Sequence, residues 1–197
     1  AGVDSQCAGS PIARARKNMA ALEALAAAEE RGRATAEEIA AMEAYSGWGG
    51  AQKAFSEKAE GEWGEIRDRL KELLSEDEFA SQRHTVLTAF YTPAPVIGAI
   101  YDALREAGIG QGDTPAAILE PGCGTGNFMR LAPADLALDF HGVELDPISA
   151  RIAQALCPEA HITAAGLEEC RVSPASFDAT IGNVPYSGDI KIDGMPI

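Results

Sequence analysis

Short apolar runs alternate with segments of helical pattern from Tyr91 onward. Four runs, at 116–120, 140–144, 161–164 and 177–181, have the length and composition of buried strands. Strands separated by helices join through right-handed crossovers, which make neighbouring strands parallel. The sequence therefore predicts an α/β fold built on a parallel sheet of about four strands.

One further helix is predicted directly before the first strand. Thr92 has the side chain of an N-cap, and Pro93 suits the first helical position because that residue needs no intrahelical N–H bond. Four apolar residues at helical spacing are predicted to face the core: Val96, Ile97, Ile100 and Leu104.

The first part of the chain has a different pattern, rich in alanine and charged residues. Capping boxes of the S/T-x-x-E type at 35–38 and 75–78 predict helix starts, and Gly32 is placed to end an earlier helix. We therefore expect two regions, a helical one at residues 1–90 and an α/β one at residues 91–197.

Within the helical region, the segment 47–50 reads Gly-Trp-Gly-Gly. A tryptophan among glycines predicts a loop fixed by one buried aromatic ring. The alternative is a loop that lies next to a cofactor or to DNA.

Charge and hydropathy exclude several classes of protein. The 197 residues carry 30 acidic and 16 basic side chains, a net charge of -14, and only 5 of the basic residues follow Phe90. No apolar run approaches the roughly 18 residues that a membrane span needs, so we expect a soluble, cytoplasmic protein with no membrane partner. Nucleic-acid binding depends on lysine and arginine, so this chain alone is poorly equipped to hold a duplex.

The cysteines and histidines are scattered: Cys7, Cys123, Cys157, Cys170, His84, His141 and His161. No C-x-x-C pair is present, so the sequence suggests neither a disulfide framework nor a structural zinc site. We interpret the histidines as structural and expect no metal site, because no His/Asp/Glu set has metal-ligand spacing.

The segment 120–126 reads Glu-Pro-Gly-Cys-Gly-Thr-Gly, where the first strand is expected to turn into a helix. Glycines at alternate positions let the backbone approach a ligand closely, and a helix N-terminus offers free N–H groups. The spacing differs from the G-x-G-x-x-G dinucleotide fingerprint. Such a loop more often receives the amino-acid part of S-adenosylmethionine.

Glu144 ends the next expected strand, 24 residues after Glu120. An acid at this place accepts hydrogen bonds from both ribose hydroxyls of a nucleoside cofactor. By itself it would be interpreted as a solvated acid at a strand end, and the glycine motif favours the binding role.

The segment 183–186 reads Asn-Val-Pro-Tyr and follows the fourth expected strand. Taken alone it is typical of a turn. At the carboxyl edge of a parallel sheet, however, it faces the crevice in which ligands bind. The asparagine oxygen and a neighbouring backbone carbonyl can accept from a planar NH2 group, while the tyrosine ring stacks on the base that carries it.

Four motifs in this order, 91–93, 120–128, 144–147 and 183–186, resemble those of the S-adenosylmethionine-dependent amino-methyltransferases that make N6-methyladenine in DNA. Their catalytic tetrapeptide is N/D-P-P-Y/F, and here Val184 replaces the first proline, which supplies no side-chain donor. The resemblance implies a Rossmann-like methyltransferase sheet preceded by helices, with S-adenosylmethionine as the cofactor.

The resemblance also implies roles for individual residues. The cofactor-binding set is Tyr91, Thr92, Pro93, Glu120, Pro121, Gly122, Cys123, Gly124, Gly126, Asn127, Phe128, Glu144, Leu145, Gly166 and Leu167. The catalytic set is Asn183, Pro185 and Tyr186. A flipped adenine would stack on Tyr186 and donate from its exocyclic nitrogen to the Asn183 side chain and the Pro185 carbonyl, and direct transfer of the methyl group would need no metal.

The resemblance extends to the organisation of the whole protein. The segments 47–50 and 84–93 look like the front of large plasmid- or phage-borne methylase-helicase polypeptides, so a fused helicase is expected. Only 56 residues separate Gly126 from Asn183, too few for an inserted recognition domain. DNA would therefore be bound through downstream regions.

Sheets of this methyltransferase type have seven strands, so we expect this chain to be the N-terminal part of a longer protein. A fourth strand with an unpaired outer edge favours self-association through 177–186. For the same reasons the chain by itself is expected to be inactive on duplex DNA.

Two other functions fit the same motifs. A planar NH2 group also occurs on the glutamine side chain of proteins and on RNA bases. Methyltransferases that act on these groups carry the same kind of tetrapeptide. The chain could alternatively be a non-catalytic cofactor-binding or interaction module, although the complete tetrapeptide argues against this.

Overall fold

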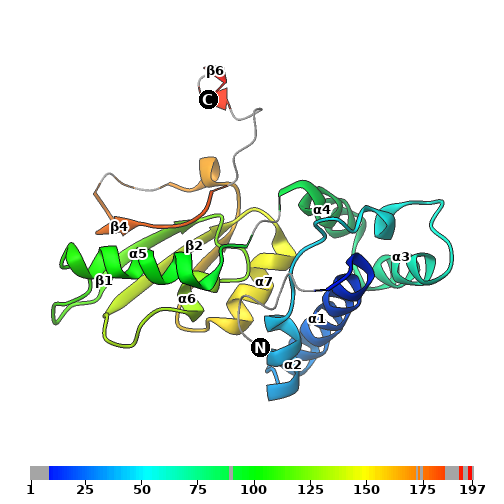
Figure 1. Ribbon diagram of the computed structural model, residues 1–197, viewed down its shortest axis with the longest axis horizontal. Helices are drawn as coiled ribbons and strands as arrows, with labels where there is room; N and C mark the ends of the chain where they lie inside the picture. Colours follow the sequence, from blue (N-terminus) through cyan, green and yellow to red (C-terminus); the bar gives the residue numbers. More distant parts are fainter. Residues whose placement is uncertain are drawn as a thin grey trace.

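The computed structural model describes residues 9–88, 91–171, 173, 175–184, 191–192 and 195–196. A helical region lies beside a twisted parallel sheet with its own helices (Figure 1). The helical region and the sheet occupy opposite ends of the molecule, with helix α7 between them (Figure 1).

Residues 9–88 contain five helical elements: α1 (Pro11–Arg31), α2 (Ala36–Glu43), the short 3-10 helix η2 (Gln52–Phe55), α3 (Glu62–Leu73) and α4 (Glu76–Thr88). Gly32 ends α1 with a φ of 77°, as predicted, because a side chain would be strained in this left-handed conformation. Both predicted capping boxes are confirmed, since the reciprocal hydrogen bonds of Thr35 with Glu38 and of Ser75 with Glu78 are present.

The Gly-Trp-Gly-Gly loop is held by its tryptophan. The Trp48 ring is fully buried and contacts the edge of Phe55, with ring centroids 5.3 Å apart. Phe55 in turn packs on Phe79 of α4 at 5.2 Å. The interpretation of this segment as a loop fixed by one buried ring is confirmed.

Four parallel strands form the sheet in the order β3-β2-β1-β4: β1 (Ala116–Pro121), β2 (Leu138–Glu144), β3 (His161–Ala164) and β4 (Ala179–Thr180). The predicted Rossmann-like parallel sheet is confirmed, with β4 shorter than its predicted run. A two-residue pair that the sequence did not predict, β5 (Lys191–Ile192) with β6 (Met195–Pro196), is antiparallel.

The helices of the sheet region are α5 (Ala94–Glu106), α6 (Asn127–Arg130), α7 (Pro147–Leu156) and the 3-10 helix η3 (Leu167–Glu169). Side chains of α5 and α6 pack on the sheet face that carries Ile118 and Phe140. Asp146 caps α7, as its Asp-Pro sequence predicted. Across the described part of the chain, no helix has both the length and the apolar character needed to cross a membrane.

The start of α5 differs from the prediction. Pro93, rather than Thr92, is the N-cap, and α5 begins at Ala94 with Pro95 in its first turn. Both prolines then lie where a missing N–H costs little, because N–H groups of the first turn have no partner within the helix. The buried face also differs from the prediction: Val96 is 49% exposed, and Tyr101 is buried.

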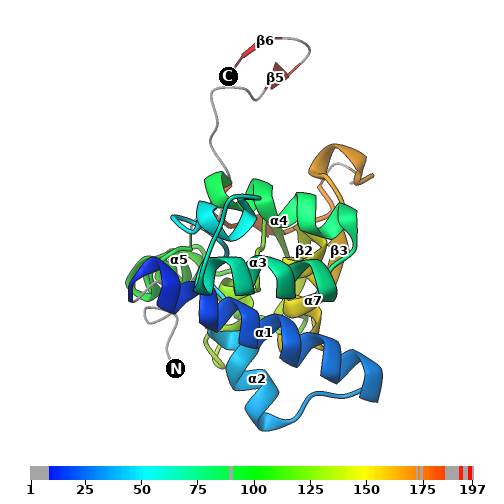
Figure 2. The ribbon, with the colours of Figure 1, turned by 90° about the vertical axis from the view of Figure 1, so that its right-hand side faces the viewer.

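Helix α7 belongs to two cores at once. Its residues Ile148 and Ile152 are buried among side chains of the helical region, and α1, α2 and α4 all contact it (Figures 1 and 2). Its other side contacts β2 and β3. The helical region is therefore packed against the sheet through a helix that the sheet itself requires.

Two glycine substitutions test the predicted backbone requirements. Gly126 has a φ of 78°, and a Cβ there would lie 2.9 Å from the Cys157 sulfur. We expect Gly126→Ala to lower the free energy of unfolding by about 1–3 kcal/mol, because left-handed strain alone costs about 1–2 kcal/mol. Urea unfolding followed by circular dichroism measures the change.

Gly98 is the matched control, since it lies inside α5 and no atom would meet its Cβ within 4 Å. Gly98→Ala should raise stability by about 0.5–1 kcal/mol, because alanine is the better helix former. Equal effects of the two substitutions would contradict the assigned role of Gly126.

Candidate functional site

The glycine motif forms a tight loop between β1 and α6. Gly122, Gly124 and Gly126 have φ values of 67°, 56° and 78°, a left-handed conformation that favours glycine. The N–H groups of Gly122 and Cys123 both donate to the Val143 carbonyl of β2, at 2.8 and 3.1 Å. The loop is thus fixed on the carboxyl ends of two neighbouring strands.

Glu144 lies directly against this loop. Its Oε2 accepts from the Gly124 N–H at 2.7 Å, and its Oε1 accepts from the Asp146 N–H at 2.8 Å. Burial raises the pKa of the Glu144 carboxyl, while the two backbone N–H groups oppose that rise. The structure therefore brings together the two motifs that the sequence predicted to share a site.

Glu120, at the end of β1, is only 2% exposed. Burial, together with the negative charge of Glu144, raises its pKa well above the usual range. Among the described residues, Glu120 Oε2 and Thr125 Oγ1 are the two buried side-chain oxygens without a hydrogen-bond partner. Buried oxygens are almost always paired, so two unpaired oxygens in one motif indicate a place where ligand donors fit.

The other predicted cofactor residues differ in how close they lie to this loop. Tyr91 lies beside it, because a Cβ on Gly124 would be 3.8 Å from the Tyr91 ring. The Ala165 N–H donates to the Glu144 carbonyl at 3.0 Å, which brings the segment 165–167 next to Glu144. Leu145, by contrast, is 74% exposed, so most of its side chain is in contact with solvent.

Several predicted cofactor residues have side chains that are packed in the interior. Thr92, Pro121, Cys123, Asn127 and Phe128 are buried. The Phe128 carbonyl accepts from the Tyr101 hydroxyl at 2.6 Å, so α5 holds the start of α6. Burial also raises the pKa of the Cys123 thiol, which keeps it protonated and unreactive.

The catalytic tetrapeptide begins at the same edge of the sheet. β4 pairs with β1, and the next residue, Ile181, donates its N–H to the Leu119 carbonyl at 3.0 Å. A Cβ on Gly182 would lie 3.3 Å from the Pro121 carbonyl oxygen, so this segment passes close to the glycine motif. Asn183 follows and is half-buried; Pro185 and Tyr186 lie outside the described residues.

A hydrogen-bond chain behind the site was not predicted from the sequence. Asp146 Oδ1 accepts from Gln82 Nε2 at 2.7 Å, and Gln82 Oε1 accepts from the Tyr45 hydroxyl at 2.5 Å and from Trp48 Nε1 at 2.9 Å. Since the Asp146 N–H donates to Glu144, the chain connects the tryptophan loop to the acid at the end of β2. A single glutamine within a helix gives no sequence signal for this role.

Two curated proteins are similar in sequence to about half of the chain. No protein-family model matches it. A stretch of 104 residues is 33% identical to the Defense against restriction protein B of Escherichia phage P1, and a stretch of 107 residues is 33% identical to the Type II methyltransferase M.XamI of Xanthomonas campestris pv. amaranthicola. These stretches cover 52% and 50% of this chain but only 4% and 19% of the two relatives.

Solved structures are similar at a coarser level. A TehB-like SAM-dependent methyltransferase from Corynebacterium glutamicum is 25% identical over 51% of this chain and 60% of its own, with a TM-score of 0.35. A Thermoplasma acidophilum protein is 18% identical over 50% of each chain, with a TM-score of 0.41.

Removing Gln82 tests the hydrogen-bond chain. Gln82→Ala leaves the buried Tyr45 hydroxyl and Trp48 N–H without their acceptor, and we expect a loss of about 2–4 kcal/mol in unfolding free energy. Urea unfolding followed by tryptophan fluorescence measures it. The control is Gln154→Ala, at an exposed position, which should stay within about 0.5 kcal/mol of the parent; equal losses would show that Gln82 has no special structural role.

The raised pKa of Glu120 makes stability depend on pH. The unfolded chain loses this proton near the usual value of 4.5, whereas the folded chain retains it to higher pH, so this group lowers stability progressively as pH rises above about 4.5. Glu120→Gln keeps the shape and removes the titration. We expect its stability advantage over the parent to grow with pH between 5 and 8 in urea unfolding, on the scale of about 1 kcal/mol or more.

The exposed Glu159 provides the control for this measurement, because Glu159→Gln makes the same chemical change at a surface side chain. A stability difference between Glu120→Gln and the parent that stays constant across the range would contradict the raised pKa.

Proposed function

We propose that this chain provides the S-adenosylmethionine-binding and amino-methyl-transfer part of a DNA adenine-N6 methyltransferase. One observation carries the proposal: the glycine loop, Glu144 and the segment leading to Asn183 meet at the carboxyl ends of β2, β1 and β4. In open parallel sheets this edge is where ligands bind.

The residues of the loop fit a ligand with an amino-acid part and a ribose. The unpaired Glu120 oxygen suits the ammonium group of the methionine part, and Glu144 suits the ribose hydroxyls. Glu144 can accept from the ribose hydroxyls in addition to the Gly124 N–H, since each carboxylate oxygen has room for more than one donor. When bound, S-adenosylmethionine supplies a methyl group on a positively charged sulfur.

The role of the chain in transfer is to hold the amine that receives the methyl group. The Asn183 side-chain oxygen accepts from the exocyclic NH2 group of adenine, with the Pro185 carbonyl as second acceptor and Tyr186 stacking on the base. Two such acceptors turn the nitrogen lone pair out of the ring and toward the methyl group. Rate enhancement then comes from positioning and from acceptors aimed at developing positive charge.

Similarity in sequence supports DNA as the substrate. Over about half its length the chain is similar to one relative named a Type II methyltransferase and to another named for defence against restriction. Restriction acts on DNA. With a net charge of -14, this chain would rely on other regions of a longer protein to hold the duplex.

Two variants separate cofactor binding from methyl transfer. Glu144→Ala should weaken S-adenosylmethionine binding about 10- to 100-fold in titration calorimetry, because hydrogen bonds to a charged group contribute about 1.5–3 kcal/mol. Asn183→Ala should bind normally and, in a protein that carries the recognition region, transfer methyl groups to adenine at least about 100-fold more slowly. Each variant is the control for the other.

Three results would contradict the proposal. If Glu144→Ala bound S-adenosylmethionine as tightly as the parent, Glu144 would not bind the ribose. If Asn183→Ala transferred methyl groups as fast as the parent, Asn183 would not be catalytic. Methylation of protein glutamine or RNA in preference to DNA adenine would move the substrate to the alternative class.

A further inference from the structure

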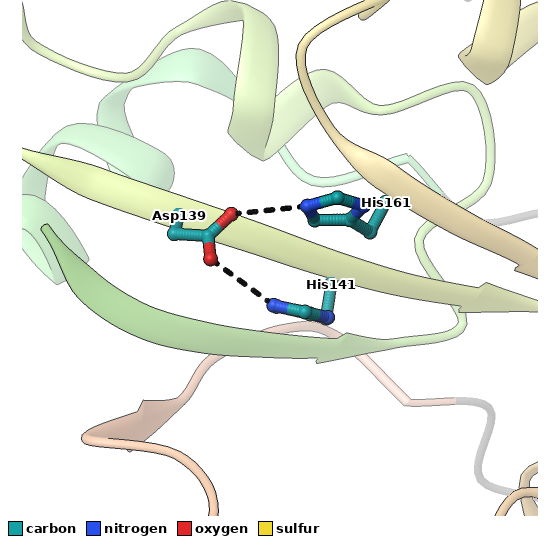
Figure 3. Close-up of side chains that lie close together, drawn as sticks. All are labelled: Asp139, His141 and His161. Carbon is teal, nitrogen blue, oxygen red and sulfur yellow. Dashed lines mark hydrogen bonds and ion pairs between the residues drawn. The ribbon is translucent and has the colours of Figure 1, made fainter.

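The sheet carries a second group of functional side chains on the face away from Ile118 and Phe140. Asp139 and His141 are two residues apart on β2, and His161 is the register partner of His141 on β3. Residues two apart on a strand share a face, and register partners of parallel strands lie side by side. The three side chains therefore point toward one another, as Figure 3 shows.

The distances within this group are close to those of a metal site. The Asp139 carboxylate has one oxygen 3.3 Å from His141 Nε2 and the other 3.7 Å from His161 Nε2. All three potential ligand atoms lie within 4.8 Å of one another. Ligand atoms around a tetrahedral Zn²⁺ ion are about 3.3 Å apart, so small side-chain rotations bring this group to binding distance.

The group is also prearranged and accessible. The two imidazole rings are stacked with centroids 4.8 Å apart, and the Phe177 ring packs on the edge of His141 at 5.2 Å. The His141, His161 and Asp139 side chains are 37%, 68% and 42% exposed. A cavity of about 410 Å³ is lined by both histidines, leaving space for water ligands.

We propose that Asp139, His141 and His161 bind one divalent transition-metal ion of the Zn²⁺ class. Two imidazoles with one carboxylate are a nitrogen-rich donor set that suits zinc and its neighbours, whereas Mg²⁺ and Ca²⁺ prefer oxygen ligands throughout. The ion links β2 to β3, the edge strand whose side chains are mostly exposed.

The site is separate from the proposed cofactor site. His141 lies three residues before Glu144, so the two side chains point to opposite faces of β2. Metal binding and cofactor binding can therefore be tested independently of each other.

Titration of Zn²⁺ into the metal-free 197-residue chain tests the proposal. Calorimetry and native mass spectrometry should find one ion bound. His161→Ala should weaken that binding at least about 100-fold, because even changes to groups that only orient metal ligands cost about 10- to 100-fold. Asp139→Asn should also weaken Zn²⁺ binding, and asparagine keeps the shape of the aspartate side chain.

Two controls exclude other ligands. His84→Ala removes a histidine from α4 and should bind Zn²⁺ as the parent does. Cys170→Ser removes a thiol that lines the same cavity, and it should also bind as the parent does. With Co²⁺ in place of Zn²⁺, the absorption spectrum should lack the thiolate charge-transfer band.

Thermal unfolding links binding to these residues in the folded chain. Zn²⁺ should raise the melting temperature of the parent and not that of His161→Ala, while both melt alike in chelator, which shows that the variant folds. Unchanged Zn²⁺ affinity in both His161→Ala and Asp139→Asn, or loss of binding in Cys170→Ser, would overturn the proposal.

Discussion

The buried carboxylate of Asp146 joins the two halves of the molecule. It accepts four hydrogen bonds: from Ser81 and Gln82 of α4, and from the backbone and hydroxyl of Ser149 in α7. A buried acid without partners would be strongly destabilising, and four donors compensate for the water that it loses. The position of the helical region relative to the sheet follows from where these donors must lie.

This arrangement makes the helical region part of the site. Asp146 also donates its own N–H to Glu144, so the orientation of Glu144 depends on residues of α4 and, through Gln82, on the Trp48 loop. In the tryptophan loop, Gly47 and Trp48 are buried while Gly50 is exposed, and Trp48 reaches the site only through its hydrogen bond to Gln82. The loop therefore contributes to the site indirectly. Trp48 orients Gln82 through a hydrogen bond, and Gln82 in turn orients Asp146.

The carboxyl edge of the sheet and one of its faces carry different chemistry. At the carboxyl ends, Glu120 and Glu144 are both buried, and burial together with the charge of Glu144 raises the pKa of Glu120. On the sheet face away from Ile118 and Phe140, the side chains of His141, His161 and Asp139 lie together and are partly exposed to solvent. Binding groups of the two kinds can coexist because alternate residues of a strand face opposite sides of the sheet.

The sequence by itself determined the elements whose signals are local. Capping boxes, the glycine at the end of α1, the four strands and the glycine-rich turn from a strand into a helix each depend on a few neighbouring residues, and all are confirmed. The expected meeting of the glycine motif with Glu144 also followed, since both end neighbouring parallel strands.

Tertiary structure alone decided the rest. Gln82 meets Asp146 across 64 residues of chain, and His141 meets His161 across two strands, so no local spacing reveals either pairing. The sequence predicted no His/Asp/Glu set at metal-ligand spacing, and only the pairing of β2 with β3 brings Asp139, His141 and His161 together. The burial of Tyr101 in α5 was likewise decided by packing, because a hydrophobic pattern gives a helix its apolar stripe but not the rotation at which that stripe meets its neighbour.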